Sequence, residues 1–144
     1  MENNDTISLL KECDAGTKMA ISSISEVLEK ISDSNMKQLL TESINKHEHL
    51  GDEIHHLLLQ HQSQEKEPSA VAKGMSWLKT NMKMSIDESD STVADLITDG
   101  CNMGVKSLSR YLNQYKAADE KSKDIAKHLI NLEEKLAIDI RQYL

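Results

Sequence analysis

Phenylalanine is absent from the 144-residue chain, which also has only one tryptophan, three tyrosines, one proline and five glycines. Because strands are enriched in aromatic and β-branched residues, the shortage of aromatics argues against a sheet. The scarcity of proline and glycine leaves few breaks in a helix interior. No stretch approaches the roughly eighteen apolar residues that span a bilayer, so we expect no membrane-spanning segment.

Cysteine is also scarce. Cys13 and Cys101 stand alone, without the C-x-x-C spacing of a redox or zinc motif. The first residues, 1–5, have no basic region followed by an apolar run, so we expect no secretion signal. Together these features predict a reduced, cytoplasmic protein.

Positive charge is in the minority. The chain has 17 basic and 24 acidic residues and a formal net charge of -7. Such a balance opposes non-specific binding to phosphate backbones and to anionic lipid surfaces. We therefore expect neither nucleic acid nor a membrane as a partner.

What the sequence does contain is a repeated helical pattern, with apolar residues spaced by three and four. This pattern predicts four long helices, and the length suits a single domain over residues 1–144. The predicted inward positions are Leu10, Cys13, Thr17, Ala20, Ile24, Val27 and Ile31; Met36, Leu40, Ser43, His47, Leu50, Ile54, Leu57 and His61; Val93, Ile97, Gly100, Gly104, Leu108, Tyr111 and Tyr115; and Ile125, Leu129, Leu132, Leu136 and Ile140.

Connections set the topology of these helices. The short polar break 32–34 leaves room only for a tight reversal, so the first two helices should be antiparallel. Residues 62–69 contain the only proline and end the second helix. A short amphipathic helix is expected over 70–84. The fold class is therefore all-α, a four-helix bundle with a long crossover that carries a short fifth helix.

Two polar residues, Ser43 and His47, take inward positions in the middle of the second helix, where the other inward residues are mostly apolar. Counting outward from the turns places Thr17 beside His47, and Gly104 level with Leu132. A layer with one metal ligand cannot hold an ion. We interpret His47 as a core histidine that hydrogen-bonds Thr17, Ser43 or a buried water and fixes the helix register.

Two glycines four residues apart suggest an alternative for this layer. Gly100 and Gly104 remove side chains from one face of their helix. A planar cofactor or small apolar ligand could use that space, with His47 as its axial or orienting group. Close helix packing is the simpler explanation, and our prediction is that the protein carries no cofactor.

A second alternative lies on the outer face of the same helix. His49, Asp52, Glu53 and His56 share one face, and imidazole with carboxylate can bind Zn, Ni or Cu. No other helix has to complete the coordination shell. Acidic residues beside histidines on a solvated face usually form electrostatic pairs instead.

Three stretches, 9–16, 69–78 and 104–112, give the chain a likeness to known proteins. They resemble an uncharacterised bacterial family of ferritin-like four-helix-bundle domains. The resemblance implies a ferritin-like fold. Ferritin-like metalloproteins carry Glu on their first and third helices and E-x-x-H on the second and fourth, but here Gly104 stands in the third-helix slot. Leu136 and Ala137 stand where histidine would follow Glu133 and Glu134, so the resemblance argues against a diiron centre.

The functional prediction follows from these absences. No nucleophile with a base, phosphate loop or pair of inward carboxylates indicates an enzyme. We predict a non-catalytic bundle that acts by binding or self-association, with a metal- or cofactor-binding bundle as the alternative. A homo-oligomer is expected, and the crossover residues Met75, Trp77 and Met82 could contact a protein partner.

Overall fold

The computed structural model describes residues 4–61 and 89–144 of the chain. Within these residues the fold is all-helical and contains no strand. Its elements are α1 (Asn4–Leu28), α2 (Ser34–Gln60), α4 (Asp90–Gln114), α5 (Glu120–Asp139) and a final 3-10 turn, Ile140–Tyr143. The helical bundle predicted from the sequence is confirmed at this level. The short helix predicted over 70–84 lies outside the described residues.

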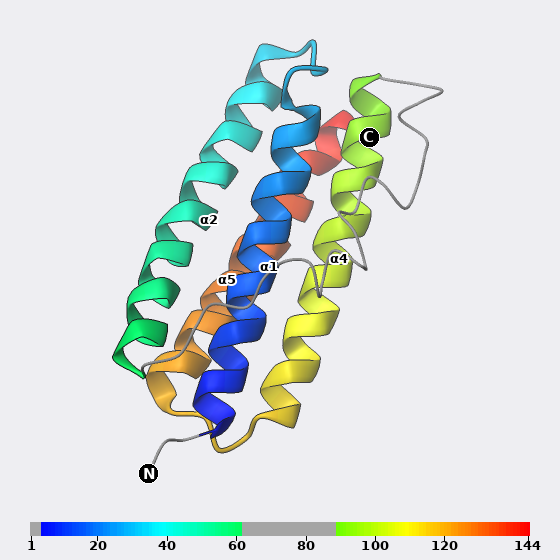
Figure 1. The fold of residues 1–144 in the computed structure, drawn as a ribbon. Coiled ribbons are helices and arrows are strands. Elements are labelled where there is room, and N and C mark those ends of the chain that lie inside the picture. The colour runs from blue at the N-terminus through cyan, green and yellow to red at the C-terminus, as the bar shows by residue number, and fades with distance from the viewer. Residues whose placement is uncertain (1–3, 62–88) are drawn as a thin grey trace.

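The four helices lie side by side along one long axis (Figure 1). A short turn reverses the chain between α1 and α2, and a second reverses it between α4 and α5. As a result, α1 and α5 run in one direction while α2 and α4 run in the other. Because α2 ends and α4 begins at opposite ends of the bundle, the connection between them is a crossover, as the sequence predicted.

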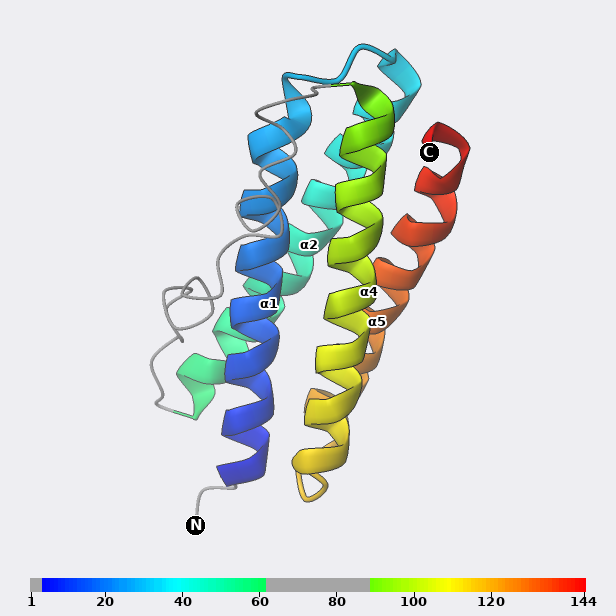
Figure 2. The same cartoon turned by 90° about the vertical axis from the view of Figure 1, so that its right-hand side faces the viewer.

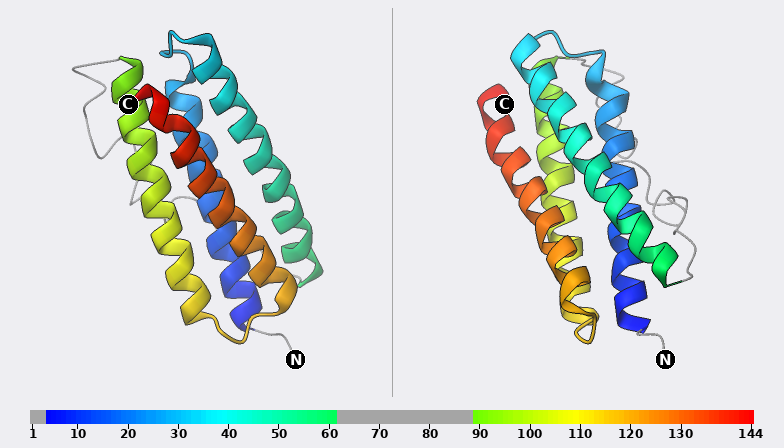
Figure 3. Two further views of the ribbon diagram at one scale, coloured as in Figure 1. Left: turned by 180° about the vertical axis from the view of Figure 1, so that it is seen from behind. Right: turned by 90° about the vertical axis from the view of Figure 1, so that its left-hand side faces the viewer.

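The helices form a four-cornered bundle. Helix α1 packs against α2 and α4, and α5 packs against the same two helices. Figure 2 shows α1 beside α4, and the left panel of Figure 3 shows α5 between α4 and α2. Helix α1 also contacts α5 across the diagonal. A Cβ placed on Gly16 would lie 3.8 Å from Leu129 Cδ2, which shows how closely the two helices approach.

The apolar core is divided into two clusters of buried side chains. One lies toward the α1–α2 turn and consists of Ala20, Ile24, Val27, Ile31, Met36, Leu40, Ile44, Val93, Ala94, Leu96, Ile97, Cys101, Leu136 and Ile140. The other lies toward the α4–α5 turn and consists of Leu9, Leu10, Cys13, Leu50, Ile54, Leu58, Leu108, Ala118, Ile125, Ala126 and Leu129. No helix in the described part of the chain is long and apolar enough to cross a membrane.

The predicted inward positions of α1 and α2 are confirmed almost throughout. All six predicted inward positions within α1 are buried, as is Ile31 just beyond its end, and those of α2 are buried from Met36 to Ile54. In the last turn of α2, Leu58 is buried while Leu57 is only partly buried. The prediction for α5 was wrong at one position. Glu133, which is 3% exposed, points inward, and Leu132 is only partly buried.

Helix caps lie at the turns. The side chains of Asp33, Ser89 and Asp119 accept hydrogen bonds from the backbone N–H three residues later and start α2, α4 and α5. Asp5 and Thr6, in the first turn of α1, have another role. The Asp5 carboxylate accepts from Ala117 N at 3.0 Å, and Thr6 Oγ1 accepts from Asp119 N at 2.8 Å. They therefore attach α1 to the α4–α5 turn.

Candidate functional site

A buried histidine and a buried glutamate face each other between the two apolar clusters. Helix α2 supplies His47, which is 0% exposed, and α5 supplies Glu133, which is 3% exposed. His47 Nε2 lies 3.6 Å from Glu133 Oε1. This separation is longer than a direct hydrogen bond but short enough for strong electrostatic attraction in a dry interior.

The other ring nitrogen of His47 fixes its tautomer. His47 Nδ1 lies 2.7 Å from the backbone oxygen of Ser43, one turn earlier in α2. A carbonyl oxygen only accepts, so Nδ1 must carry a proton and donate it. The Ser43 hydroxyl also approaches Nδ1, at 3.4 Å. The predicted contact with Ser43 is therefore confirmed, whereas Thr17 Oγ1 donates to the backbone oxygen of Asp14 at 2.9 Å.

In this tautomer Nε2 is the ring nitrogen that faces the Glu133 carboxylate. If His47 were neutral and Glu133 ionised, a lone pair on Nε2 would face a carboxylate oxygen. A proton on Nε2 turns that repulsion into an attraction between opposite charges. Burial by itself lowers the pKa of His47, but the Glu133 carboxylate and the Ser43 carbonyl outweigh burial. The net effect is a pKa above 6.5.

Gly104 on α4 makes room for the Glu133 side chain. A Cβ at position 104 would lie 3.3 Å from Glu133 Oε1, closer than most side chains tolerate. The structure thus brings Gly104 level with Glu133, one residue from the predicted neighbour Leu132. The space that the sequence suggested for a planar cofactor above Gly104 holds this carboxylate. Gly100, one turn earlier, is buried in the same helix.

Cys101 of α4 lies beside the same carboxylate. Burial and then the negative charge of Glu133 raise the pKa of the Cys101 thiol above its usual range. Burial, with Glu12 and Asp14, also raises the pKa of Cys13 to about 12. Both cysteines are free and buried. They remain protonated near neutral pH and are poor nucleophiles and poor metal ligands.

The outer face of α2 is arranged differently. His49, Asp52 and His56 are exposed, and the Glu53 carboxylate pairs with Lys121 Nζ of α5 at 3.0 Å. Across residues 4–61 and 89–144, no three His, Cys, Asp or Glu side chains form a group that could hold a metal ion. The geometry gives no support to the metal site suggested for this face.

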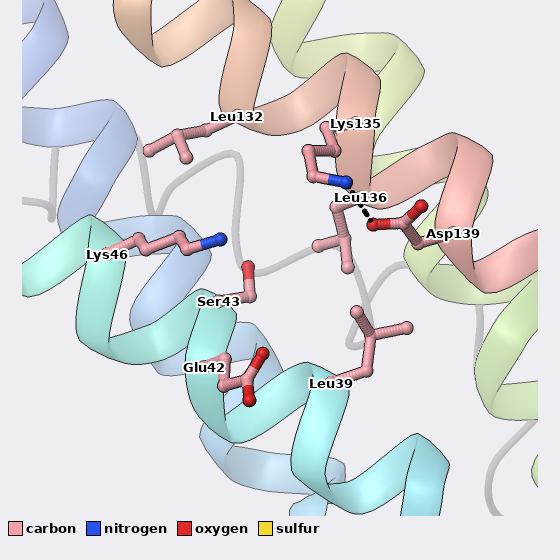
Figure 4. A pocket seen from close by; sticks show the side chains of 8 residues that line it. All are labelled: Leu39, Glu42, Ser43, Lys46, Leu132, Lys135, Leu136 and Asp139. Carbon is pink, nitrogen blue, oxygen red and sulfur yellow. Dashed lines mark hydrogen bonds and ion pairs between the residues drawn. The ribbon is translucent and has the colours of Figure 1, made fainter.

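A groove of about 110 Å³ lies between α2 and α5 (Figure 4). Ser43 and Leu136 point into it, and charged side chains of both signs surround them. At its rim Lys135 Nζ lies 3.0 Å from Asp139 Oδ2. An open groove surrounded by charges of both signs has no obvious preference for a charged ligand. Its importance is that Ser43 connects it to the His47 ring.

A second cavity, of about 90 Å³, lies between α1 and α4 and reaches Glu133. Of the buried pair, Glu133 lines this cavity, whereas His47 is linked to the α2–α5 groove only through Ser43. Sequence reasoning missed Glu133. The available signal was an acidic residue one position from the predicted α5 seam, at the level of a glycine on the neighbouring helix.

Comparison with known protein families, with curated proteins and with solved structures finds no match to this chain. Its fold and its buried pair are therefore interpreted from their own geometry. The residues Met75, Trp77 and Met82, suggested as a partner-binding surface, lie outside the described residues.

Proposed function

We propose that this protein is a ferritin-like helical bundle without a diiron centre, and that it acts by binding rather than by catalysis. The topology supports the fold proposal, because two helical hairpins joined by one long crossover characterise that class. The functional proposal depends mainly on one observation. The central layer has one histidine and one carboxylate, and each is the other's electrostatic partner.

A diiron centre needs far more ligands than this layer offers. Ferritin-like sites use a Glu from each of two helices and a Glu-x-x-His pair from each of the other two. In α2 the residue three positions before His47 is Ile44 instead of a glutamate. In α5 the residue three positions after Glu133 is Leu136 instead of a histidine. Helix α4 has Gly104 at this level. The donor set that remains is suited to an internal ion pair.

Catalysis is also disfavoured by the surroundings of the pair. A general base must reach the proton that it removes, either directly or through one water. His47 is fully buried, and its Nδ1 proton is donated to the Ser43 carbonyl. The neighbouring thiol of Cys101 has a raised pKa because of burial and Glu133, which opposes nucleophilic attack.

Elemental analysis and an ultraviolet-visible spectrum of the purified full-length protein test this proposal. We expect less than one metal ion per chain and no visible absorption band. A stoichiometric transition metal that is lost in His47→Leu but kept in His49→Leu would favour a metal-binding bundle instead. A visible chromophore lost in the same variant would favour the cofactor-binding alternative.

We also propose that the protein forms a homo-oligomer. The two free thiols favour a cytoplasmic location. Light scattering coupled to size exclusion tests the oligomer. A dimer that becomes a monomer on Trp77→Ala would support the crossover as the contact. A wild-type monomer would contradict self-association.

A further inference from the structure

The cavity between α1 and α4 combines an apolar wall with a buried acid. Helix α1 contributes Met19 and α4 contributes Met103, Leu108 and Tyr111, so most of the wall is thioether, aliphatic or aromatic. Met103 is 52% exposed, so the cavity reaches the surface beside it. In Figure 2 the two helices that form this cavity lie in front.

Glu133 lies on the wall of this cavity and has an unused acceptor. Oε1 faces His47, but Oε2 has no hydrogen-bond partner within the described residues. The thiol of Cys101 lies nearby, and an S–H group is only a weak donor. A buried carboxylate oxygen left without a donor is costly, because it has lost its hydrogen bonds to water. The site therefore favours any molecule that brings a donor to Oε2.

Electrostatics decides which kind of donor is preferred. Glu12 also lines the cavity, and burial and then the Glu12 carboxylate raise the pKa of the neighbouring Tyr111 hydroxyl. None of the described residues around the cavity is basic. His47 offsets part of the Glu133 charge, but the lining adds a second carboxylate and no basic side chain, so a cationic donor is preferred to an anion. A tyrosine ring beside two thioethers suits the apolar part of an organic cation.

We propose that this cavity binds a small organic ammonium ion, whose N–H groups donate to Glu133 and whose short apolar chain packs against Met19, Met103 and Tyr111. This inference rests on the proposed binding function and names its ligand class. Gly104 is the residue that makes the site, because a side chain there would come within 3.3 Å of the Glu133 carboxylate.

The size of the cavity limits the ligand. A cavity of about 150 Å³ accommodates benzene. At about 90 Å³, this cavity suits a smaller molecule, such as an amine with a short alkyl chain. Hydrated inorganic cations match poorly, because apolar walls cannot replace their water.

Calorimetric titration and thermal unfolding of the full-length protein with n-butylammonium chloride test the proposal. We expect saturable binding and a rise of the unfolding midpoint with concentration. Potassium chloride at the same ionic strength controls for general charge screening, and 1-butanol controls for the apolar chain. A response to 1-butanol equal to that of the amine would show that the carboxylate has no part and would overturn the proposal.

Variants locate the binding. Glu133→Gln removes the charge with little change of shape and should weaken n-butylammonium binding by about tenfold or more. Glu134→Gln is the matched control, because it removes the same charge from an exposed neighbour on α5 and should bind like the wild type. Unchanged binding by a folded Glu133→Gln protein would place the amine elsewhere and overturn the proposal.

A second pair of variants leaves the buried acid untouched, so it serves even if Glu133→Gln fails to fold. Ser107→Leu fills the cavity from α4 and should abolish binding, whereas Ser109→Leu on the same helix lies outside the lining and should not. Equal binding by both variants would contradict the site. A stoichiometric metal in the purified protein contradicts the proposed function, while a metal-free protein that ignores the amine contradicts only this inference.

Discussion

The two apolar clusters and the polar layer between them are stabilised by opposite means. In the clusters, any well-shaped aliphatic residue can contribute, because burial of apolar surface has no directional requirement. In the layer, His47 and Glu133 are stabilising together, since His47 alone would leave Nε2 buried without a partner and Glu133 alone would leave its carboxylate without one. The comparison shows that the ends of the bundle supply stability and that the middle sets which residues must face each other.

The largest expected effect comes from breaking the pair one residue at a time. His47→Leu or Glu133→Leu should each lower the free energy of unfolding by about 3–5 kcal/mol, because a buried polar group then loses its partner. The double variant should be more stable than either single variant. Chemical denaturation at pH 7 measures all three, and simple addition of the two losses would show that the residues act independently.

Truncation in the clusters should cost slightly less. Leu96→Ala in one cluster and Leu10→Ala in the other should each lower the free energy of unfolding by about 2–5 kcal/mol, because both side chains are fully buried. The loss in free energy of unfolding caused by these two truncations should be the same from about pH 6 to about pH 8, whereas the loss caused by removing the pair should change with pH. Denaturation at several pH values measures it, and a strong pH dependence would show that the clusters are coupled to the pair.

The pair should make stability depend on pH in a defined direction. The pKa of His47 is raised in the folded protein, so its contribution is complete below about 6.5 and is lost as pH rises through the folded pKa. Each unit of pKa shift corresponds to about 1.4 kcal/mol.

The His47→Leu/Glu133→Leu double variant is the reference, because it lacks both groups and retains the cysteines. Above a pH of about 8.5 both proteins should lose stability, since burial raises the pKa values of Cys13 and Cys101. Below a pH of about 8.5 the difference between wild type and double variant isolates the pair, whereas above it the Cys101 contribution also differs, because Glu133 helps to raise the Cys101 pKa. A difference that grows between pH 6.5 and 8.5 (roughly) would contradict the raised pKa of His47.

The smallest expected effect lies on the surface. Lys135 Nζ and Asp139 Oδ2 are 3.0 Å apart, but the lysine side chain is 65% exposed. Lys135→Ala should change the free energy of unfolding by about 0.5 kcal/mol or less. If Lys135→Ala lowered the free energy of unfolding as much as loss of the buried pair does, solvent exposure would not explain the difference between a surface ion pair and a buried one.

The sequence was sufficient for the helices and most of their inward faces, because a spacing of three and four identifies a buried stripe wherever it is apolar. The spacing predicted the wrong inward residue where an apolar and a polar residue are neighbours and either could face the core. At Leu132 and Glu133 both spacings fit a helical period, and polarity favoured the leucine. Only the absence of a side chain at Gly104 on the neighbouring helix makes Glu133 the better fit, and that contact depends on tertiary register.

The caps show the same limit. Asp33 and Ser89 lie before apolar stripes, which is the usual local signal for a helix start. Asp5 and Thr6 have that appearance too, yet they bind backbone groups more than a hundred residues away, in the α4–α5 turn. A local pattern cannot distinguish a cap from a contact between distant segments.

These long-range contacts occur at both ends of the bundle. At one end Asp90 accepts from the backbone N–H groups of Ser32 and Asp33, at 2.8 and 3.0 Å. At the other, Asp5 and Thr6 accept from Ala117 and Asp119. Each donor belongs to the turn of one hairpin and each acceptor to a helix of the other. In a hydrogen-exchange experiment these four amides would exchange slowly only while the hairpins are docked, so they report assembly of the bundle separately from formation of its helices.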